Sequence, residues 1–180
     1  MNIYLARHGE TDWNRNGILM GQADIPLNIK GKEQATKIAN SLKDVEFDIC
    51  YSSPLSRAKE TAEIICQGKK IVEDNLLKER GSGIYSGKNK NQIDWDEYSK
   101  DNSVESCEVL FERAKEFSKK LEYIDAENVL IVSHSGLLKN LLHILKNGDF
   151  ETFDWNSYSD SFKNNCDFIV IQKNSKIHLS

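Results

Sequence analysis

The sequence feature that most limits the fold is the apolar run from Asn128 to Val132, which ends in Ser133-His134. A nearly continuous apolar run of this length is typical of a strand in a parallel sheet that is buried on both faces. Such a strand needs neighbouring strands on both sides and helices above and below it. The run therefore predicts an α/β protein with this strand near the centre of its sheet.

Apolar periodicity elsewhere in the chain predicts the other elements. A short buried strand is expected in the stretch that opens at Ile3 and runs into Arg7-His8. Further strands are predicted at 47–51, 70–73 and 168–172, and helices at 31–42, 55–66, 106–124 and 136–146. In this order the elements predict a three-layer α/β/α sandwich with a mostly parallel central sheet. We expect a single domain over residues 1–180, with a small lid around 84–105.

Several local predictions accompany these elements. Ser53 is expected to cap the second helix with Pro54 in its first turn, and Val109 is expected on the buried face of the third. The helical spacing puts His143 on the polar side of the fourth helix, so we interpret it as a surface residue, and we interpret His178 in the same way.

The charge and cysteine pattern narrow the class of protein. A formal net charge of −4 argues against a nucleic-acid partner, because binding a polyanion usually needs a basic face. The four cysteines show no pairing typical of a zinc site, and we interpret them as free thiols. No apolar stretch is long enough to cross a membrane, and no leader segment is recognised, so we expect a cytoplasmic protein without a membrane partner.

Polar and cationic residues follow three of the predicted strands. Arg7-His8 follows the first, Ser52-Ser53 leads to Arg57 after the second, and Ser133-His134 follows the central one. Loops at the carboxyl ends of parallel strands meet at one edge of the sheet. Two arginines and two histidines that meet there would form a pocket for a tetrahedral dianion such as phosphate. Because no carboxylate cluster indicates a metal, we expect these side chains to neutralise the anion without a metal or a cofactor.

The same residues carry a resemblance to a known family. Arg7-His8-Gly9-Glu10-Thr11 followed by Asn14 resembles the signature of the histidine phosphatase superfamily, the phosphoglycerate-mutase-like proteins. Other blocks that resemble this family follow in the same order: 21–35, 52–62, Glu79 with Gly83 and Gly87, Glu105-Ser106 with Arg113, 129–136, and Asn165-Cys166. The resemblance covers nearly the whole chain and points to the small phosphatase branch with its phosphoglycerate-mutase-like fold.

The resemblance implies a two-step phosphoryl transfer. His8 would attack phosphorus to form a phosphohistidine, while Arg7, Arg57 and His134 hold the phosphoryl oxygens, and water would then hydrolyse the intermediate. Glu79 would protonate the leaving alcohol and later help to deprotonate water. Substrate contacts are expected at Asn14, Gly21, Gln22, Arg80 and Ser135. For Arg80 a solvent-exposed position is an equally open interpretation.

Two departures from the family pattern stand out. The block of the second histidine more often reads His-Gly-Gly, and here it is His134-Ser135-Gly136. The acidic loop often carries a carboxylate at the position of Ser86, which leaves Glu79 as the expected acid.

Three functions remain open from the sequence. The short 88–128 interval favours a phosphatase over a phosphoglycerate mutase, and a non-catalytic phospho-ligand binding protein is the third alternative. The substrate is expected to be a small phosphomonoester. α-Ribazole phosphate, phosphoserine, sugar phosphates and phosphoglycerates are all compatible with the resemblance.

Overall fold

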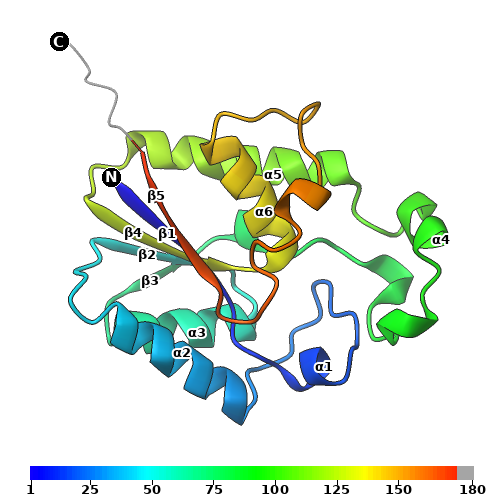
Figure 1. The fold of residues 1–180 in the computed structure, drawn as a ribbon, viewed down its shortest axis with the longest axis horizontal. Coiled ribbons are helices and arrows are strands. Elements are labelled where there is room, and N and C mark those ends of the chain that lie inside the picture. The colour runs from blue at the N-terminus through cyan, green and yellow to red at the C-terminus, as the bar shows by residue number, and fades with distance from the viewer. Residues whose placement is uncertain (174–180) are drawn as a thin grey trace.

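The computed structural model describes residues 1–173, in which a five-stranded sheet lies between two pairs of helices (Figure 1). The strand order is β3-β2-β4-β1-β5, and only the edge strand β5 runs antiparallel to its neighbour. The strands are β1 (Asn2–Arg7), β2 (Ile49–Ser52), β3 (Ile71–Glu73), β4 (Asn128–Ser133) and β5 (Phe168–Gln172). This architecture confirms the predicted α/β fold with its mostly parallel sheet.

Helices cover both faces of the sheet. On one face lie α2 (Ile29–Ser41) and α3 (Ser56–Cys66), and on the other lie α5 (Cys107–Lys120) and α6 (Ser135–Leu145) (Figure 1). The short helices α1 (Asp12–Arg15) and α4 (Trp95–Lys100) stand away from the sheet, on the side toward which β1 runs. The carboxyl ends of the parallel strands therefore open toward these two short helices.

The central strand β4 has the double-sided burial that its apolar run predicts. Val129 and Ile131 pack into the core beneath α5 and α6, whereas Leu130 and Val132 pack into the core beneath α2 and α3. All four side chains are fully buried. Because successive strand residues point to opposite faces, one uninterrupted apolar run supplies both cores.

The buried stripe of α5 begins one residue later than predicted. Leu110, Ala114, Phe117 and Leu121 are buried at a spacing of three and four residues, which is one face of a helix. Val109 precedes this stripe and is 53% exposed, so its predicted inward position was wrong.

The start of α3 also differs from the prediction. The helix begins at Ser56, and its N-cap position is Leu55 rather than Ser53. The carboxylate of Asp24 accepts hydrogen bonds from the backbone N and the hydroxyl of Ser56, at 2.7 and 2.8 Å. A side chain from a distant loop therefore satisfies the helix start, which local sequence does not reveal.

Two of the cysteines differ from the predicted free thiols. Cys50 on β2 and Cys66 at the end of α3 form a disulfide, while Cys107 and Cys166 are free. The two cysteines are 16 residues apart in the sequence, and they meet because α3 packs back against β2.

His143 is buried, and its Nδ1 lies 2.9 Å from the hydroxyl of Tyr158, because residues after α6 cover this part of the helix. His178 lies outside the described residues.

The segment expected as a lid folds into an ordered unit. It contains α4 and a small apolar cluster of Tyr85, Ile93, Tyr98 and Val104. Its chain is joined to the segment after α1 by a bridge between Ile18 and Asn89. None of the helices among residues 1–173 combines the length and the apolar character that a membrane span requires.

Candidate active site

The two histidines lie side by side because of the strand register. Arg7 at the end of β1 pairs with Ser133 at the end of β4, so His8 and His134 follow at equivalent positions. Their ring centroids are 5.1 Å apart. A cavity of about 390 Å³ opens at this edge of the sheet, and His8 forms part of its wall. His134 lies beside His8 and is not itself one of the lining residues.

The protonation state of His8 follows from its surroundings. Its Nδ1 lies 2.7 Å from the carbonyl oxygen of Gly9, which can only accept a hydrogen bond. We therefore assign the proton to Nδ1, which leaves a lone pair on Nε2. Burial, together with the nearby guanidinium groups of Arg57 and Arg7, holds the pKa of His8 well below its usual value. The site thus contains a neutral imidazole with one unprotonated nitrogen.

The backbone of the loop that carries His8 is held from several sides. Thr61 on α3 accepts a hydrogen bond from the N–H of Gly9 at 3.0 Å, and the amide of Asn165 donates to the carbonyl of His8 at 3.1 Å. Gly9 is required for a close approach, since a Cβ at this position would lie 2.5 Å from the carbonyl oxygen of Gly31. The imidazole is therefore carried by a rigid backbone.

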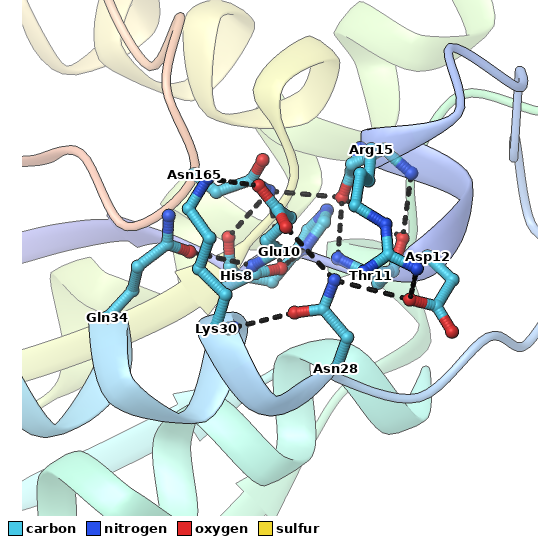
Figure 2. Close-up of polar contacts among 12 residues, drawn as sticks. His8, Glu10, Thr11, Asp12, Arg15, Asn28, Lys30, Gln34 and Asn165 are labelled. Carbon is cyan, nitrogen blue, oxygen red and sulfur yellow. Dashed lines mark hydrogen bonds and ion pairs between the residues drawn. The ribbon is translucent and has the colours of Figure 1, made fainter.

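Figure 2 shows the outer side of this loop, where Glu10 meets the start of α2. Its carboxylate accepts a hydrogen bond from Asn28 at 3.0 Å and pairs with Lys30 at 2.9 Å. The backbone N of Glu10 donates to Gln34 at 2.9 Å. Glu10 is therefore occupied in anchoring the loop to α2, and it is not among the residues that line the cavity.

Two of the arginines that line the cavity, Arg7 and Arg57, are each fixed by backbone carbonyls. Nη1 of Arg7 donates a hydrogen bond to the backbone carbonyl of Phe162 at 3.0 Å. Arg57 is fully buried, and it donates to Ala23 at 2.7 Å and to Gly21 at 2.9 Å. Carbonyl partners orient the guanidinium groups without neutralising them. Burial lowers the pKa of Arg57 to about 10.

These arginines also retain unused donors. Within the described part of the chain, Nε of Arg7 and Nε of Arg57 are buried without a hydrogen-bond partner. A buried N–H that lacks a partner is costly, so each guanidinium group is held at this site at the expense of one hydrogen bond. Two positive groups that line the cavity beside a neutral imidazole favour an anion in it.

His134 has a different environment from His8. Its Nε2 lies 2.9 Å from the hydroxyl of Ser53, the residue that was predicted to cap a helix. Burial lowers the pKa of His134 well below its usual value, and Arg57 and His8 lower it further. Its Nδ1 is buried and, among the described residues, has no partner. His134 is therefore a neutral, fixed group in the free protein.

Glu79 reaches the cavity from the loop after β3. Its carboxylate accepts hydrogen bonds from the backbone N of Arg80 at 2.9 Å and of Gly136 at 3.3 Å. Gly136 lies in the first turn of α6, where free N–H groups favour a carboxylate. This contact places an acid on the side of the cavity formed by α6.

The loop that carries Glu79 is organised by a partly buried ion pair that the sequence did not reveal. Arg113 binds Glu105 through two hydrogen bonds of 2.7 and 2.9 Å, the bidentate geometry that suits a carboxylate. The same guanidinium donates to the carbonyls of Leu76 and Lys78 at 2.8 and 3.0 Å. In the sequence, the only indication of this pair is that Glu105 and Arg113 belong to a block that resembles the family.

The remaining predicted residues divide into two groups. Asn14, Gly21, Arg80 and Ser135 line the cavity. Gln22 does not, and its amide instead donates to the backbone carbonyl of Glu79 at 2.9 Å. Arg80 is not free in solvent, because its Nε donates to the carbonyl of Glu105 at 2.7 Å.

Three lysines line the same cavity and were not singled out from the sequence: Lys90, Lys139 and Lys163. They come from segments that are far apart in the chain and carry no local motif. Only the fold brings them to one site.

This fold and this arrangement of histidines, arginines and an acid define one class of protein. The chain matches the model of the histidine phosphatase superfamily (branch 1) over residues 3–172, and it therefore belongs to this superfamily.

Individual relatives agree with this assignment. The chain is 37% identical over 158 residues to the uncharacterized phosphatase PhoE of Bacillus subtilis, and the match covers 83% of this chain and 79% of the relative. Among solved structures, YhfR of Bacillus stearothermophilus superposes with a TM-score of 0.84 at 29% identity, covering 96% of this chain and 91% of that one. The α-ribazole phosphatase of Shigella flexneri gives a TM-score of 0.81 at 26% identity, covering 97% and 91%.

Proposed function

We propose that this protein is a metal-independent phosphomonoesterase in which His8 is the nucleophile. The observation that carries this proposal is the environment of His8: its imidazole is buried beside two arginines, and its Nδ1 lies 2.7 Å from the carbonyl oxygen of Gly9, so we assign the lone pair to Nε2. A neutral imidazole attacks phosphorus without a separate base. Membership of a superfamily of phosphatases supports the same activity.

The first step transfers the phosphoryl group to the enzyme. The guanidinium groups of Arg7 and Arg57, which line the cavity, bind the phosphoryl oxygens, with His134 beside His8. Nε2 of His8 forms a bond to phosphorus as the bond from phosphorus to the ester oxygen breaks. Glu79, in its protonated form, gives its proton to that oxygen, and the alcohol leaves.

The second step reverses these roles with water. The Glu79 carboxylate accepts a proton from water as the water oxygen bonds to phosphorus and the bond to Nε2 breaks. Inorganic phosphate leaves and His8 returns to its neutral form. The guanidinium groups are already fixed by carbonyls, so little reorganisation is needed while charge moves between the oxygens.

The substrate that we propose is a small phosphorylated metabolite. Asn14, Gly21, Arg80 and Ser135 are in a position to contact it from the cavity wall, whereas Gln22 would act through the backbone of Glu79. The cavity of about 390 Å³ suits a small phosphomonoester. The relative that is named α-ribazole phosphatase acts on an ester of this kind.

We place the protein in the cytoplasm, where small phosphorylated metabolites are formed. The free thiols Cys107 and Cys166 fit a reducing compartment, whereas the Cys50–Cys66 disulfide is more typical of an oxidising one. Cell fractionation with an antibody tests this placement, and recovery of the protein outside the cytoplasm would refute it.

Hydrolysis of p-nitrophenyl phosphate in the presence of EDTA tests the function directly. We expect turnover that chelator does not change, together with acid-labile phosphate on the denatured enzyme. Turnover that disappears with EDTA would refute the metal-independent mechanism. Absence of both turnover and labelled enzyme would favour the alternative of a phospho-ligand binding protein. Interconversion of 2- and 3-phosphoglycerate faster than phosphate release would favour the mutase.

A further inference from the structure

The cavity carries far more positive charge than the chain as a whole. Its walls contain six cationic side chains and one carboxylate, that of Glu79, although the net charge of the protein is −4. The cationic residues are Arg7, Arg57, Arg80, Lys90, Lys139 and Lys163. A concentration of one sign in a cleft marks the charge of the ligand that the cleft attracts.

A single phosphate group does not account for all of these cations. A phosphoryl dianion is balanced by the two guanidinium groups of Arg7 and Arg57, which line the cavity. Arg80 already donates to the carbonyl of Glu105 and lies over the ring of Tyr98, 5.3 Å from its centroid. Three lysines remain after these assignments.

The three lysines reach the cavity from separate elements. Lys139 lies one helical turn after Ser135 on α6, so both residues share the face that lines the cavity. Lys90 begins a short 3₁₀ helix, and its backbone N donates to the carbonyl of Gly17 at 2.9 Å. Lys163 follows Phe162 just before β5, and its carbonyl accepts from Arg7. Each lysine is therefore attached to a fixed part of the wall.

These lysines also lack strong partners. Within residues 1–173 the ion pairs do not include Lys90 or Lys139. Lys163 pairs only with Asp160, at 3.5 Å, and both side chains are largely exposed, so this pair is weak. Burial and the charge of Arg7 lower the pKa of both Lys90 and Lys139. An anion near these two ammonium groups would relieve the unfavourable interaction.

We propose that the physiological substrate carries a second anionic group, a carboxylate or a further phosphate, and that Lys90, Lys139 and Lys163 bind it. This inference rests on the proposed function, because it takes the phosphate that reacts to be the one at His8. The apolar side chains of Leu19, Met20 and Tyr98 line the same cavity and would contact the carbon part of the substrate. Esters with a neutral alcohol would then bind more weakly.

A matched set of three esters tests this inference by binding. Glycerol 3-phosphate has a neutral second end, 3-phosphoglycerate has a carboxylate there, and glycerol 1,3-bisphosphate has a phosphate. Calorimetry with His8→Ala measures their dissociation constants without turnover. We expect at least one of the two anionic esters to bind about tenfold more tightly than glycerol 3-phosphate, since a charge-assisted hydrogen bond is worth about that factor. The tighter of the two identifies the second group as carboxylate or phosphate.

Lysine substitutions in the same background assign the residues. Lys139→Gln and Lys90→Gln should each reduce the preference to less than about threefold, while Lys139→Arg should retain it because the charge remains. Lys119→Gln is the matched control, because Lys119 is exposed at the end of α5 and does not line the cavity. It removes the same charge and should leave the preference unchanged.

Two results would overturn the inference. One is equal binding of all three esters, and the other is a preference that survives both Lys90→Gln and Lys139→Gln. Phosphoenzyme formation by the wild-type protein is measured separately with p-nitrophenyl phosphate. If that reaction fails while the binding preference is present, the proposed catalytic function is wrong and the anionic subsite stands. If hydrolysis occurs without the preference, the phosphatase stands and the subsite is refuted.

Discussion

Because Gly136 contacts Glu79, a substitution at Gly136 can displace the carboxylate of Glu79 while the glutamate itself is retained. A Cβ at Gly136 would lie 2.5 Å from Oε1 of Glu79, whereas ordinary contact begins near 3.4 Å. In Gly136→Ala the carboxylate must therefore retreat by about 0.9 Å. Its hydrogen bond from the backbone N of Gly136, already 3.3 Å long, would be lost in the process.

The expected loss of catalytic rate in Gly136→Ala follows from this displacement of the carboxylate. A shift of about 1 Å in a reacting group typically costs about 100-fold in rate, and general acid catalysis contributes about 10²–10⁴-fold in total. We expect kcat/KM for an alkyl ester such as glycerol 3-phosphate to fall by about 100-fold in Gly136→Ala. For p-nitrophenyl phosphate the fall should be less than about tenfold, because its leaving group needs no proton.

Stability distinguishes this effect from misfolding. Gly136 lies in the first turn of α6, where alanine is favoured over glycine by less than the value of about 1 kcal/mol in a helix interior. The obstructing atom is the far end of a flexible side chain, so the fold itself has no need to shift. The urea midpoint of Gly136→Ala should accordingly equal or exceed that of the wild type.

Gly81→Ala is the matched control, because a Cβ there meets the side chain of Glu105 at an ordinary 3.4 Å. It makes the same substitution in the loop of Glu79 and should retain both activities. Equal losses of Gly136→Ala on the alkyl and aryl esters would refute a proton-transfer role for Glu79. Retention of full activity on the alkyl ester would refute the placement of its carboxylate.

Three further predictions concern the same site. His8→Ala should abolish acid-labile phosphate on the enzyme, as measured by quenching with labelled substrate, and any residual label would place the nucleophile elsewhere. Glu79→Gln should reduce hydrolysis of alkyl esters by about 10²–10⁴-fold and of aryl esters far less, and equal losses would tell against an acid. The folded-state pKa values of His8 and His134 are depressed, so below about pH 6.5 the unfolded chain binds protons that the folded one does not. The free energy of unfolding should therefore fall with decreasing pH, by up to about 1.4 kcal/mol per pH unit for each histidine. Urea titrations at pH 5 and pH 7 measure this slope, which His8→Asn should reduce; an unchanged slope would refute the buried neutral state.

Local hydrophobic patterns in the sequence were sufficient to predict the strands of the sheet. The run 128–132 predicted a central strand, and the structure buries it between β1 and β2 with both cores against it. The ends of three strands predicted that Arg7, Arg57 and two histidines meet at one edge, and the register of β1 with β4 places His8 beside His134. These features follow from backbone geometry, which repeats along a strand and is visible in the residue order.

The predictions that were wrong concern residues whose environment is set by contacts with residues far away in the sequence. Ser53 was predicted to cap a helix, but its hydroxyl contacts His134 while Asp24 holds the helix start. His143 was assigned to the surface, yet residues from the loop after α6 cover it. The pairing of Cys50 with Cys66 likewise depends on how α3 packs against β2. None of these contacts leaves a trace in the local sequence.

By itself, the sequence determined the class of fold and the family resemblance, and it predicted the edge of the sheet at which we expect an anion to bind. Tertiary structure alone decided which nitrogen of His8 is free, because the carbonyl of Gly9 holds the other one. It also decided that Lys90, Lys139 and Lys163 share a cavity with the arginines. The physical reason is that periodicity and motifs encode backbone geometry, whereas hydrogen-bond partners and charge clusters depend on side chains that only the folded chain brings together.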